Sequence, residues 1–340
     1  MLLSSRKVGM SAFENIEPVL GRNAELVRIS NSEIQTFKQC KRKWMLGNYY
    51  GLAQKDKPFD GALPLGVRIH EALDGYYTDG RNEPPVDKYT RLQNADNQRF
   101  IQSPDSQDKA KVDKFNKESE LGRIMMEGYT EWLEESSADA DIDFIMQEEA
   151  LRYRPEEFGG RVEVIGKIDA LVRRVHDGFL AVLDFKTAAT FNDYRKAAHH
   201  SEQMPTYINL KMKSDPDSPK IDGARYRLLK KVKRSATAKP PFYEDQDVRF
   251  NRKALDSHWK RLLGTIREML ELRDRLDAGE DHQFYAYPTQ KMGWECTSCP
   301  FFNGCFMLDD GSDAEGFFTD NYIQVDPNDR YNENVESETD

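Results

Sequence analysis

The segment VLDFKTA, residues 182–188, decides the fold, because it places a carboxylate and a lysine two residues apart at the end of an apolar run. The earlier segment GKIDALV, residues 166–172, carries a second carboxylate, Asp169. Both segments have the apolar and β-branched composition of strands, and the residues HDG at 176–178 predict a tight turn between them. We therefore expect two antiparallel strands that bring Asp169 close to Asp184.

Side chains two residues apart on a strand point to the same face of a sheet, so Asp184 and Lys186 share a face. Two neighbouring carboxylates repel each other unless a cation lies between them. Their oxygens suit Mg²⁺ or Mn²⁺, and a lysine beside them can orient or help to deprotonate a water. An Asp-x-Lys pair alone is also common on solvated strands, so the metal hypothesis needs support from other segments.

Two other segments give that support. QMPTY, residues 203–207, places Gln203 and Tyr207 four residues apart, which puts them on one face of a helix. LGVRIHEALDGYY, residues 65–77, predicts a second helix with a histidine, His70, on its apolar stripe. A histidine there is either a satisfied core residue or a ligand.

The order of these motifs resembles the RecB-like branch of the PD-(D/E)xK nucleases. The resemblance implies an α/β fold with the mixed central sheet of the restriction-endonuclease-like core and helical N-terminal additions. It implies that Mg²⁺ or Mn²⁺ is held by His70, Asp169, Asp184 and the backbone carbonyl of Phe185. It implies that Lys186 is the catalytic lysine and that Gln203 and Tyr207 organise the site and the DNA strand. Glu148 and Glu149, in the preceding strand, are candidates for an outer ligand.

Three of the four cysteines lie within WECTSCPFFNGC, residues 294–305, as Cys296, Cys299 and Cys305. The fourth, Cys40, lies some 250 residues earlier. Four thiolates can hold a [4Fe–4S] cluster or a tetrahedral Zn²⁺ ion, and the residues alone do not separate the two. Disulfides are a third alternative, disfavoured because no export signal is visible.

The spacing of these cysteines, and the helix SEIQTFKQCKRKWMLG (32–47), resemble the iron–sulfur arrangement of the Cas4 and AddB-type nucleases. The resemblance implies a [4Fe–4S] cluster, with structural zinc as the alternative. Such a cluster would staple the two ends of one nuclease domain, and we expect the neighbouring aromatic residues Trp294, Phe301, Phe302 and Phe306 to shield it.

The remaining pattern divides the chain into regions. We expect an irregular arm at 1–30, a nuclease domain at 31–307 with an irregular insertion near 79–112, and a tail at 308–340. Within the domain, helices are expected at 31–52 (Ser32 as N-cap, Gln35 completing a capping box, Cys40 on the buried face), 65–77 (Val67, His70, Leu73 and Tyr77 in one stripe), 113–136, about 193–213 and about 252–278. Strands are expected in 144–154, 161–175, 178–188 and 223–233.

The charge is concentrated in that tail. The chain has a net charge of −10, and residues 308–340 alone hold eleven acids and one base. The rest of the chain is therefore neutral. The tail's Asp, Asn, Glu and Ser predict a disordered, solubilising segment, with screening of a basic surface or tethering of a partner as the alternatives.

Two basic runs are candidates for a DNA path. YRLLKKVKRSATAKP, residues 226–240, holds lysines and arginines and no acid, and Tyr226, Phe242 or Tyr243 could stack on unpaired bases. The alternative is a solvated strand end and loop. CKRKW, residues 40–44, is the second run.

These observations lead to one function and one rival. We expect a Mg/Mn-dependent DNA exonuclease acting at DNA ends, preferring single strands, in recombination, repair or replication. The rival is a non-catalytic or partner-dependent iron–sulfur subunit of a recombination or spacer-acquisition complex. No P-loop is visible, so unwinding would need a helicase partner. Without a signal peptide or a long apolar run, the expected location is the cytoplasm, or the host cytoplasm for a phage protein.

Overall fold

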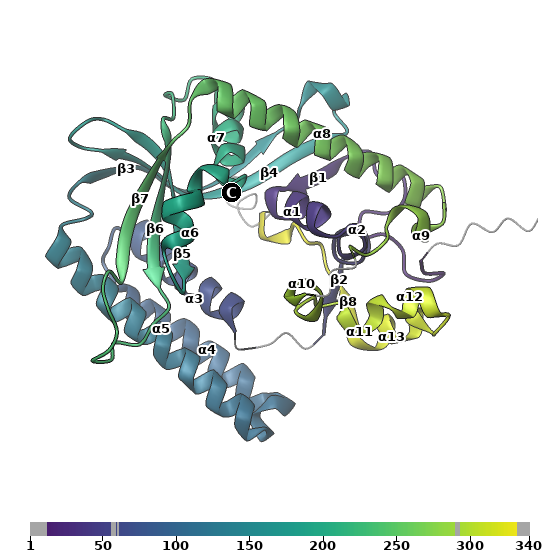
Figure 1. The fold of residues 1–340 in the computed structure, drawn as a ribbon, viewed down its shortest axis with the longest axis horizontal. Helices are drawn as coiled ribbons and strands as arrows, with labels where there is room; N and C mark the ends of the chain where they lie inside the picture. Colours follow the sequence, from purple (N-terminus) through teal and green to yellow (C-terminus); the bar gives the residue numbers. More distant parts are fainter. Residues whose placement is uncertain (1–11, 56–58, 60, 290–292, 332–340) are drawn as a thin grey trace, which may run out of the picture. The chain divides into compact units, whose positions relative to one another are not determined.

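The computed structural model describes residues 12–55, 59, 61–289 and 293–331 (Figure 1). The strands are β1 (Val27–Ser30), β2 (Leu52–Gln54), β3 (Ile142–Tyr153), β4 (Val162–Arg174), β5 (Leu180–Ala188), β6 (Gly223–Lys230), β7 (Tyr243–Arg249) and β8 (Tyr322–Gln324). The longer helices are α1 (Asn31–Gln39), α3 (Ala62–Thr78), α4 (Pro85–Gln102), α5 (Lys109–Ser136), α6 (Asn192–Ala197), α7 (Gln203–Ser214), α8 (Arg252–Asp277) and α13 (Ala314–Asn321). Single turns form α2 (Lys41–Trp44), α9 (His282–Tyr285), α10 (Trp294–Thr297), α11 (Phe302–Cys305) and α12 (Met307–Asp310), and a π-helical turn covers Met45–Tyr49.

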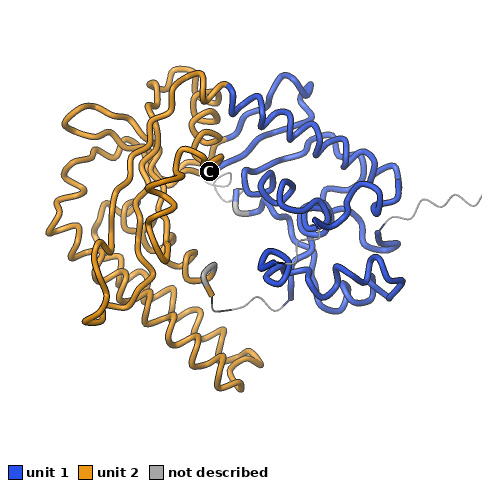
Figure 2. Tube along the Cα trace, in the orientation of Figure 1, with its two compact units in different colours: residues 1–57, 152–166, 257–340 blue, residues 58–151, 167–256 orange. Residues whose placement is uncertain are grey.

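The chain forms two compact units (Figure 2). Unit 1 consists of residues 1–57, 152–166 and 257–340, and unit 2 of residues 58–151 and 167–256. The chain therefore passes from unit 1 into unit 2 and back twice.

The central sheet mixes parallel and antiparallel strands. Its order is β1-β4-β5-β6-β7, with β3 also paired to β4. Strands β4 and β5 are antiparallel, β5 and β6 are parallel, and β6 and β7 are antiparallel. This is the expected α/β class with a mixed sheet, so the predicted fold is confirmed.

In unit 2, helices α3, α4 and α5 build the core on one face of the sheet. Leu73 and Tyr77 of α3 and Met125 and Tyr129 of α5 are buried against Ala181, Leu183 and Phe185 of β5. Because side chains alternate along a strand, Val182, Asp184 and Lys186 point to the other face. Helix α7 contacts β5 and β6 there, with its own buried face. Site residues and core residues therefore alternate along β5.

Unit 1 begins differently from the sequence prediction. Helix α1 starts at Asn31, and its N-cap is Ser30, whose hydroxyl accepts a hydrogen bond from the Glu33 N–H. The predicted cap, Ser32, was wrong by two residues. The predicted helix 31–52 is also broken at Cys40, whose extended backbone (φ −163°) ends α1, while its sulfur accepts from the Lys43 N–H and begins α2. Cys40 is therefore half-buried rather than on a buried helical face.

Three regions expected to be irregular hold regular structure. The insertion near 79–112 contains α4, the arm ends in β1, and the tail up to residue 331 contains α12, α13 and β8. Within unit 1, β8 pairs antiparallel with β2, and Phe318 and Tyr322 pack their rings near Phe301. The rest of the predicted disordered tail, 332–340, lies outside the described residues. No helix in the described part of the chain combines the length and apolar character needed to cross a bilayer.

Candidate active site

The predicted carboxylates meet in unit 2. The backbone pairing of β4 with β5 runs to Ala170 opposite Leu183, and the next residue of each strand toward the site is Asp169 and Asp184. Beyond that point the Phe185 N–H donates to the Asp169 Oδ2 at 2.9 Å instead of to the partner backbone. A side chain thus replaces a ladder hydrogen bond at the place where the two acids converge.

Lys186 binds its neighbour on the same strand face. Its Nζ lies 2.9 Å from Oδ1 and 2.7 Å from Oδ2 of Asp184. The Asp184 carboxylate is nearly buried, with 6% of its side chain exposed, whereas Lys186 keeps 24% exposed. The lysine therefore connects a buried acid to accessible space.

Helix α7 supplies the third component. The Gln203 side-chain amide donates to Asp184 Oδ1 at 3.2 Å and to the Tyr207 hydroxyl at 3.4 Å. The predicted four-residue spacing on one helical face is what brings these groups together.

Helix α3 supplies the histidine. His70 Nδ1 lies 3.7 Å from Asp169 Oδ2, and its ring meets the Phe185 ring edge to face, with centroids 6.3 Å apart. His70 is half-buried, and Val67 of the predicted stripe is exposed, so the core face of α3 is formed by Leu65, Ile69, Leu73 and Tyr77 instead. The position of His70 beside the acids, rather than in the core, favours the ligand interpretation.

The electrostatics of the site follow from burial and from the two acids. Burial and the neighbouring Asp184 raise the pKa of Asp169 above its usual value. Burial alone would lower the pKa of Lys186, but the adjacent Asp184 carboxylate outweighs it, and the net shift is upward. Lys186 is therefore a cation at neutral pH.

The donor set matches a hard divalent ion. Two carboxylates and a carbonyl are the oxygen ligands that Mg²⁺ and Mn²⁺ prefer, whereas the imidazole of His70 is a nitrogen ligand that softer divalent ions favour. The residues fit such an ion because one Asp184 oxygen, although buried, accepts no hydrogen bond and has only the Lys186 cation beside it. Across the described ranges, no three His, Cys, Asp or Glu side chains already stand at metal-ligand spacing. Binding would therefore require small side-chain movements.

The four cysteines gather in unit 1. Cys40, Cys296, Cys299 and Cys305 are half-buried free thiols that line one cavity of about 280 Å³. Burial raises the pKa of the Cys299 and Cys305 thiols. Arg42 is buried beneath this cavity, where it donates to the Cys305 carbonyl at 3.2 Å and forms an ion pair with Asp309. The segment around Cys40 and the segment 296–305 thus meet at one cavity, although they are distant in the sequence.

The four aromatic residues of the predicted shield differ in exposure. Phe301 is buried, but Trp294, Phe302 and Phe306 are 73%, 52% and 70% exposed. Phe301, Phe302 and Phe306 line the cysteine cavity, and the shielding of a cluster by these rings stays a prediction.

Part of the basic run 226–240 is structural, although Lys233 and Lys239 are exposed. Tyr226 and Tyr243 are buried, and the half-buried Phe242 ring is covered by the Arg234 guanidinium at 3.8 Å from its centroid. Arg227 is fully buried between acids. In the second run, Arg42 is buried too, so these residues are removed from the predicted DNA path.

Three residues near the candidate active site make contacts that the sequence did not predict. Glu148 forms an ion pair with Lys167, and Glu149 pairs with Lys211 at 3.0 Å, so both acids already have cationic partners. Tyr194 of α6 lies close enough to Lys186 and Asp184 for its pKa to respond to both. Nothing in the local sequence NDYRKA distinguishes Tyr194 from a surface tyrosine.

The fold and this site define the restriction-endonuclease-like class, in which two acids and a lysine lie on adjacent strands of a mixed sheet. The chain belongs to the PD-(D/E)XK nuclease superfamily, whose family model matches residues 28–306. The chain is therefore a nuclease by family, with DNA as the implied substrate, and nucleases of this superfamily generally use divalent ions such as Mg²⁺ or Mn²⁺. No curated protein matches the sequence. A solved structure described as "Crystal structure of SSO0001" aligns over 60% of this chain and 76% of that chain, with 16% identity and a TM-score of 0.28.

Proposed function

We propose that this nuclease is an exonuclease of the Cas4/RecB-like type that degrades DNA from its ends with a preference for single strands, in recombination, repair or replication. The observation that carries the proposal is the convergence of Asp169, Asp184 and Lys186 in unit 2, with Gln203 hydrogen-bonded to Asp184. The proposed location is the cytoplasm.

The proposed roles follow from the contacts. His70, Asp169, Asp184 and the Phe185 carbonyl would hold Mg²⁺ or Mn²⁺, which when bound supplies Lewis-acid stabilisation of charge on the scissile phosphate. Because Lys186 is cationic, its ammonium group is suited to donating hydrogen bonds to the attacking water or to a phosphate oxygen, rather than to removing a proton. Gln203 holds Asp184 Oδ1 in place, and Tyr207 supports Gln203.

The cysteines are proposed to hold a [4Fe–4S] cluster in the domain that spans 31–307. Zn–S bonds of about 2.3 Å would draw four sulfur atoms tightly around one ion. The four thiols instead help to line a cavity of about 280 Å³, which leaves room for a larger group. Iron and zinc content after anaerobic purification distinguishes the cluster from structural zinc.

Single-strand preference is supported by exposed rings in unit 1. Phe284, Tyr287, Trp294, Phe302 and Phe306 are half of the large apolar side chains that are exposed in the described part of the chain. Tyr287 also lines an open groove of about 660 Å³ with Lys38 and Lys41, although Glu268 lies there too. Aromatic faces beside lysines suit stacking on unpaired bases and contact with the phosphate backbone.

The test is digestion of end-labelled single- and double-stranded DNA with Mn²⁺ or Mg²⁺ by anaerobically purified protein. Lys186→Ala should lower the rate by at least about 100-fold, the loss typical of a donor that stabilises transition-state charge. Lys196→Ala, an exposed lysine of the same unit, is the matched control and should retain the rate. If Lys186→Ala digests DNA as fast as Lys196→Ala, the proposed active site is refuted. If the wild type binds DNA without digesting it, the result supports the alternative of a non-catalytic or partner-dependent subunit.

A further inference from the structure

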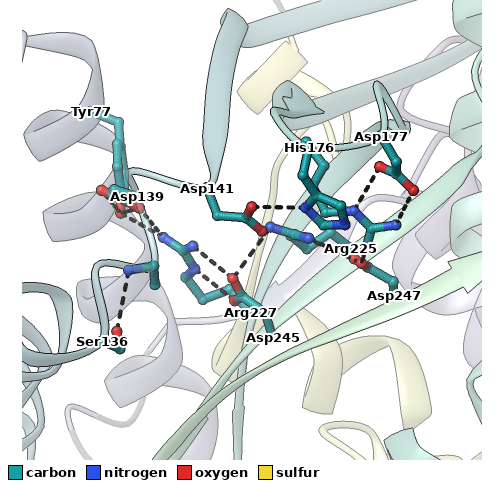
Figure 3. A network of polar contacts seen from close by, with 12 residues as sticks. Tyr77, Ser136, Asp139, Asp141, His176, Asp177, Arg225, Arg227, Asp245 and Asp247 are labelled. Atoms are coloured by element: carbon teal, nitrogen blue, oxygen red, sulfur yellow. Dashed lines mark hydrogen bonds and ion pairs between the residues drawn. The ribbon is translucent and has the colours of Figure 1, made fainter.

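Arg227 is a fully buried cation within a charge network in unit 2, between Asp139 and Asp245 (Figure 3). From β6 it donates to Asp245 of β7 through Nε and Nη2, both at 2.8 Å. Its Nη1 lies 2.5 Å from Asp139 Oδ1, in the segment between α5 and β3. Arg81 lies 3.6 Å from Asp139 and Arg225 lies 3.6 Å from Asp245, so two acids face three bases.

The same guanidinium holds a tyrosine hydroxyl. Arg227 Nη1 donates to Tyr77 Oη at 2.9 Å, and this hydroxyl also lies 2.6 Å from the Tyr129 hydroxyl and 3.1 Å from Asp139 Oδ2. Tyr77 is therefore fixed at its polar end by three groups, of which Arg227 and Tyr129 are fully buried.

The apolar end of Tyr77 reaches the candidate active site. Its ring is stacked between Phe144, at a centroid distance of 4.6 Å, and Phe185, at 5.6 Å, and both pairs are within 20° of parallel. Phe185 is the residue between Asp184 and Lys186. Its N–H donates to Asp169 and its ring packs edge to face with His70. A chain of direct contacts thus runs from Arg227 through Tyr77 to the backbone on which the acids are mounted.

We propose that Arg227 and Tyr77 are positioning residues that fix the Phe185 peptide, and through it the spacing of Asp169, Asp184 and His70. The inference rests on the proposed function, in which these groups hold a divalent ion. Neither positioning residue touches the ion or the DNA; Tyr77 acts through its ring and Arg227 acts through the Tyr77 hydroxyl.

The free-energy cost of burying these charged groups supports a positioning role. Replacing a buried ion pair by apolar residues of similar volume is often neutral or stabilising, so stability alone does not account for this Arg–Asp–Tyr network. A hydrogen-bonded hydroxyl does fix a ring in one orientation, which packing alone does less sharply. Removing Arg227 would leave Asp139 and Asp245 short of a cation, so its loss tests folding rather than positioning.

Tyr77→Phe is the informative variant, because it keeps the ring and removes only the hydroxyl. Tyr89→Phe is the matched control: Tyr89 is also a buried tyrosine of unit 2, and its hydroxyl donates to the Ser119 carbonyl rather than to the network around Arg227. Both variants should lose similar thermal stability. Only Tyr77→Phe should weaken Mn²⁺ binding measured by calorimetry, by about 10-fold, as is typical when a group supporting a ligand is lost.

A second readout needs neither metal nor activity. In the metal-free protein, amide hydrogen exchange at Phe185 should become faster in Tyr77→Phe and stay unchanged in Tyr89→Phe, because the Phe185 N–H is bonded to Asp169. Unchanged exchange and unchanged Mn²⁺ affinity in Tyr77→Phe would overturn the positioning role. If the wild type neither binds Mn²⁺ nor cleaves DNA, the proposed function fails, whereas the exchange comparison still decides whether Tyr77 holds the Phe185 peptide.

Discussion

Glu33 is a buried carboxylic acid in unit 1 whose ionisation opposes folding. Burial raises its pKa from 4.5 to about 7, although the Trp44 indole N–H donates to it at 2.9 Å. Between pH 4.5 and 7 the native state binds more protons than the unfolded chain at this group. The free energy of unfolding should therefore fall as the pH rises through this window, by about 3 kcal/mol for this residue.

Glu33→Gln should remove that dependence, because glutamine can still accept from the indole and carries no charge. We expect the variant to be more stable than the wild type above pH 7, with a smaller difference at pH 4.5, in urea unfolding at both pH values. Glu25→Gln, at an exposed acid, is the control and should leave the dependence intact. A wild-type slope retained in Glu33→Gln would show that Glu33 is not the group that titrates.

The sequence predicts the surroundings of some residues but not of others. The proximity of Asp169 and Asp184 follows from strand alternation and a short turn, both of which are local properties. The buried state of Tyr226 and Arg227 does not follow, because it depends on partners from β7 and from the segment after α5. A basic run identified by sequence alone therefore overestimates the charge available to DNA.

At the scale of elements, substitution of the N-cap residue tests where helix α1 begins. Ser30→Ala should lower the free energy of unfolding by about 1 kcal/mol, because the Glu33 N–H loses its acceptor. Ser32→Ala should cost less, since the N-cap of α1 is Ser30 and Ser32 lies inside the helix, with its hydroxyl 2.9 Å from that of Ser30. Chemical denaturation of both variants makes the comparison, and a larger loss in Ser32→Ala would restore the cap predicted from the sequence.

The packing of α4 on α5 depends on a glycine. A Cβ at Gly122 would lie 2.0 Å from the Tyr89 hydroxyl and 2.2 Å from Cζ of the same ring. Gly122→Ala should therefore destabilise the protein by about 1–3 kcal/mol, despite the better helix propensity of alanine. Gly264→Ala in α8, where nothing lies within 4 Å, is the control and should stabilise by up to about 1 kcal/mol. Thermal unfolding separates them, and stabilisation by both would mean that Tyr89 moves aside at no cost.

Helices and strands whose apolar residues recur at a regular spacing could be predicted from the sequence. Those held in place by polar contacts could not. Strands β4 and β5 carry long apolar runs, and both were expected. Helix α4 has few buried side chains, and one of them is Asp96, which is paired with Arg68 at 2.6 Å. Strand β7 (YEDQDVR) is a strand because Asp245 and Asp247 pair with arginines of β6. Such elements are specified by their partners, so no local period reveals them.

At the scale of the whole molecule, the cysteine site joins segments more than 250 residues apart. On the proposal that it holds a cluster, Cys299→Ser or removal of iron by a chelator should destabilise unit 1 by about 5 kcal/mol, the loop-closure entropy of a cross-link of this span. Hydrogen exchange should show loss of protection in α1, α2 and α11. Unchanged exchange after loss of iron would mean that the cysteines carry no structural metal.

The division of unit 1 into three segments also sets an order of events during translation. A ribosome releases Cys40 early, but Cys296, Cys299 and Cys305 emerge only after every residue of unit 2 has been made. Domains generally fold as units while the chain is synthesised. Unit 2 can therefore reach its native contacts while unit 1 still lacks its third segment, so an incomplete chain would hold Asp169, Asp184 and Lys186 with only one of the four thiols. Any cell that makes this protein has to load the proposed cluster as a late step of maturation.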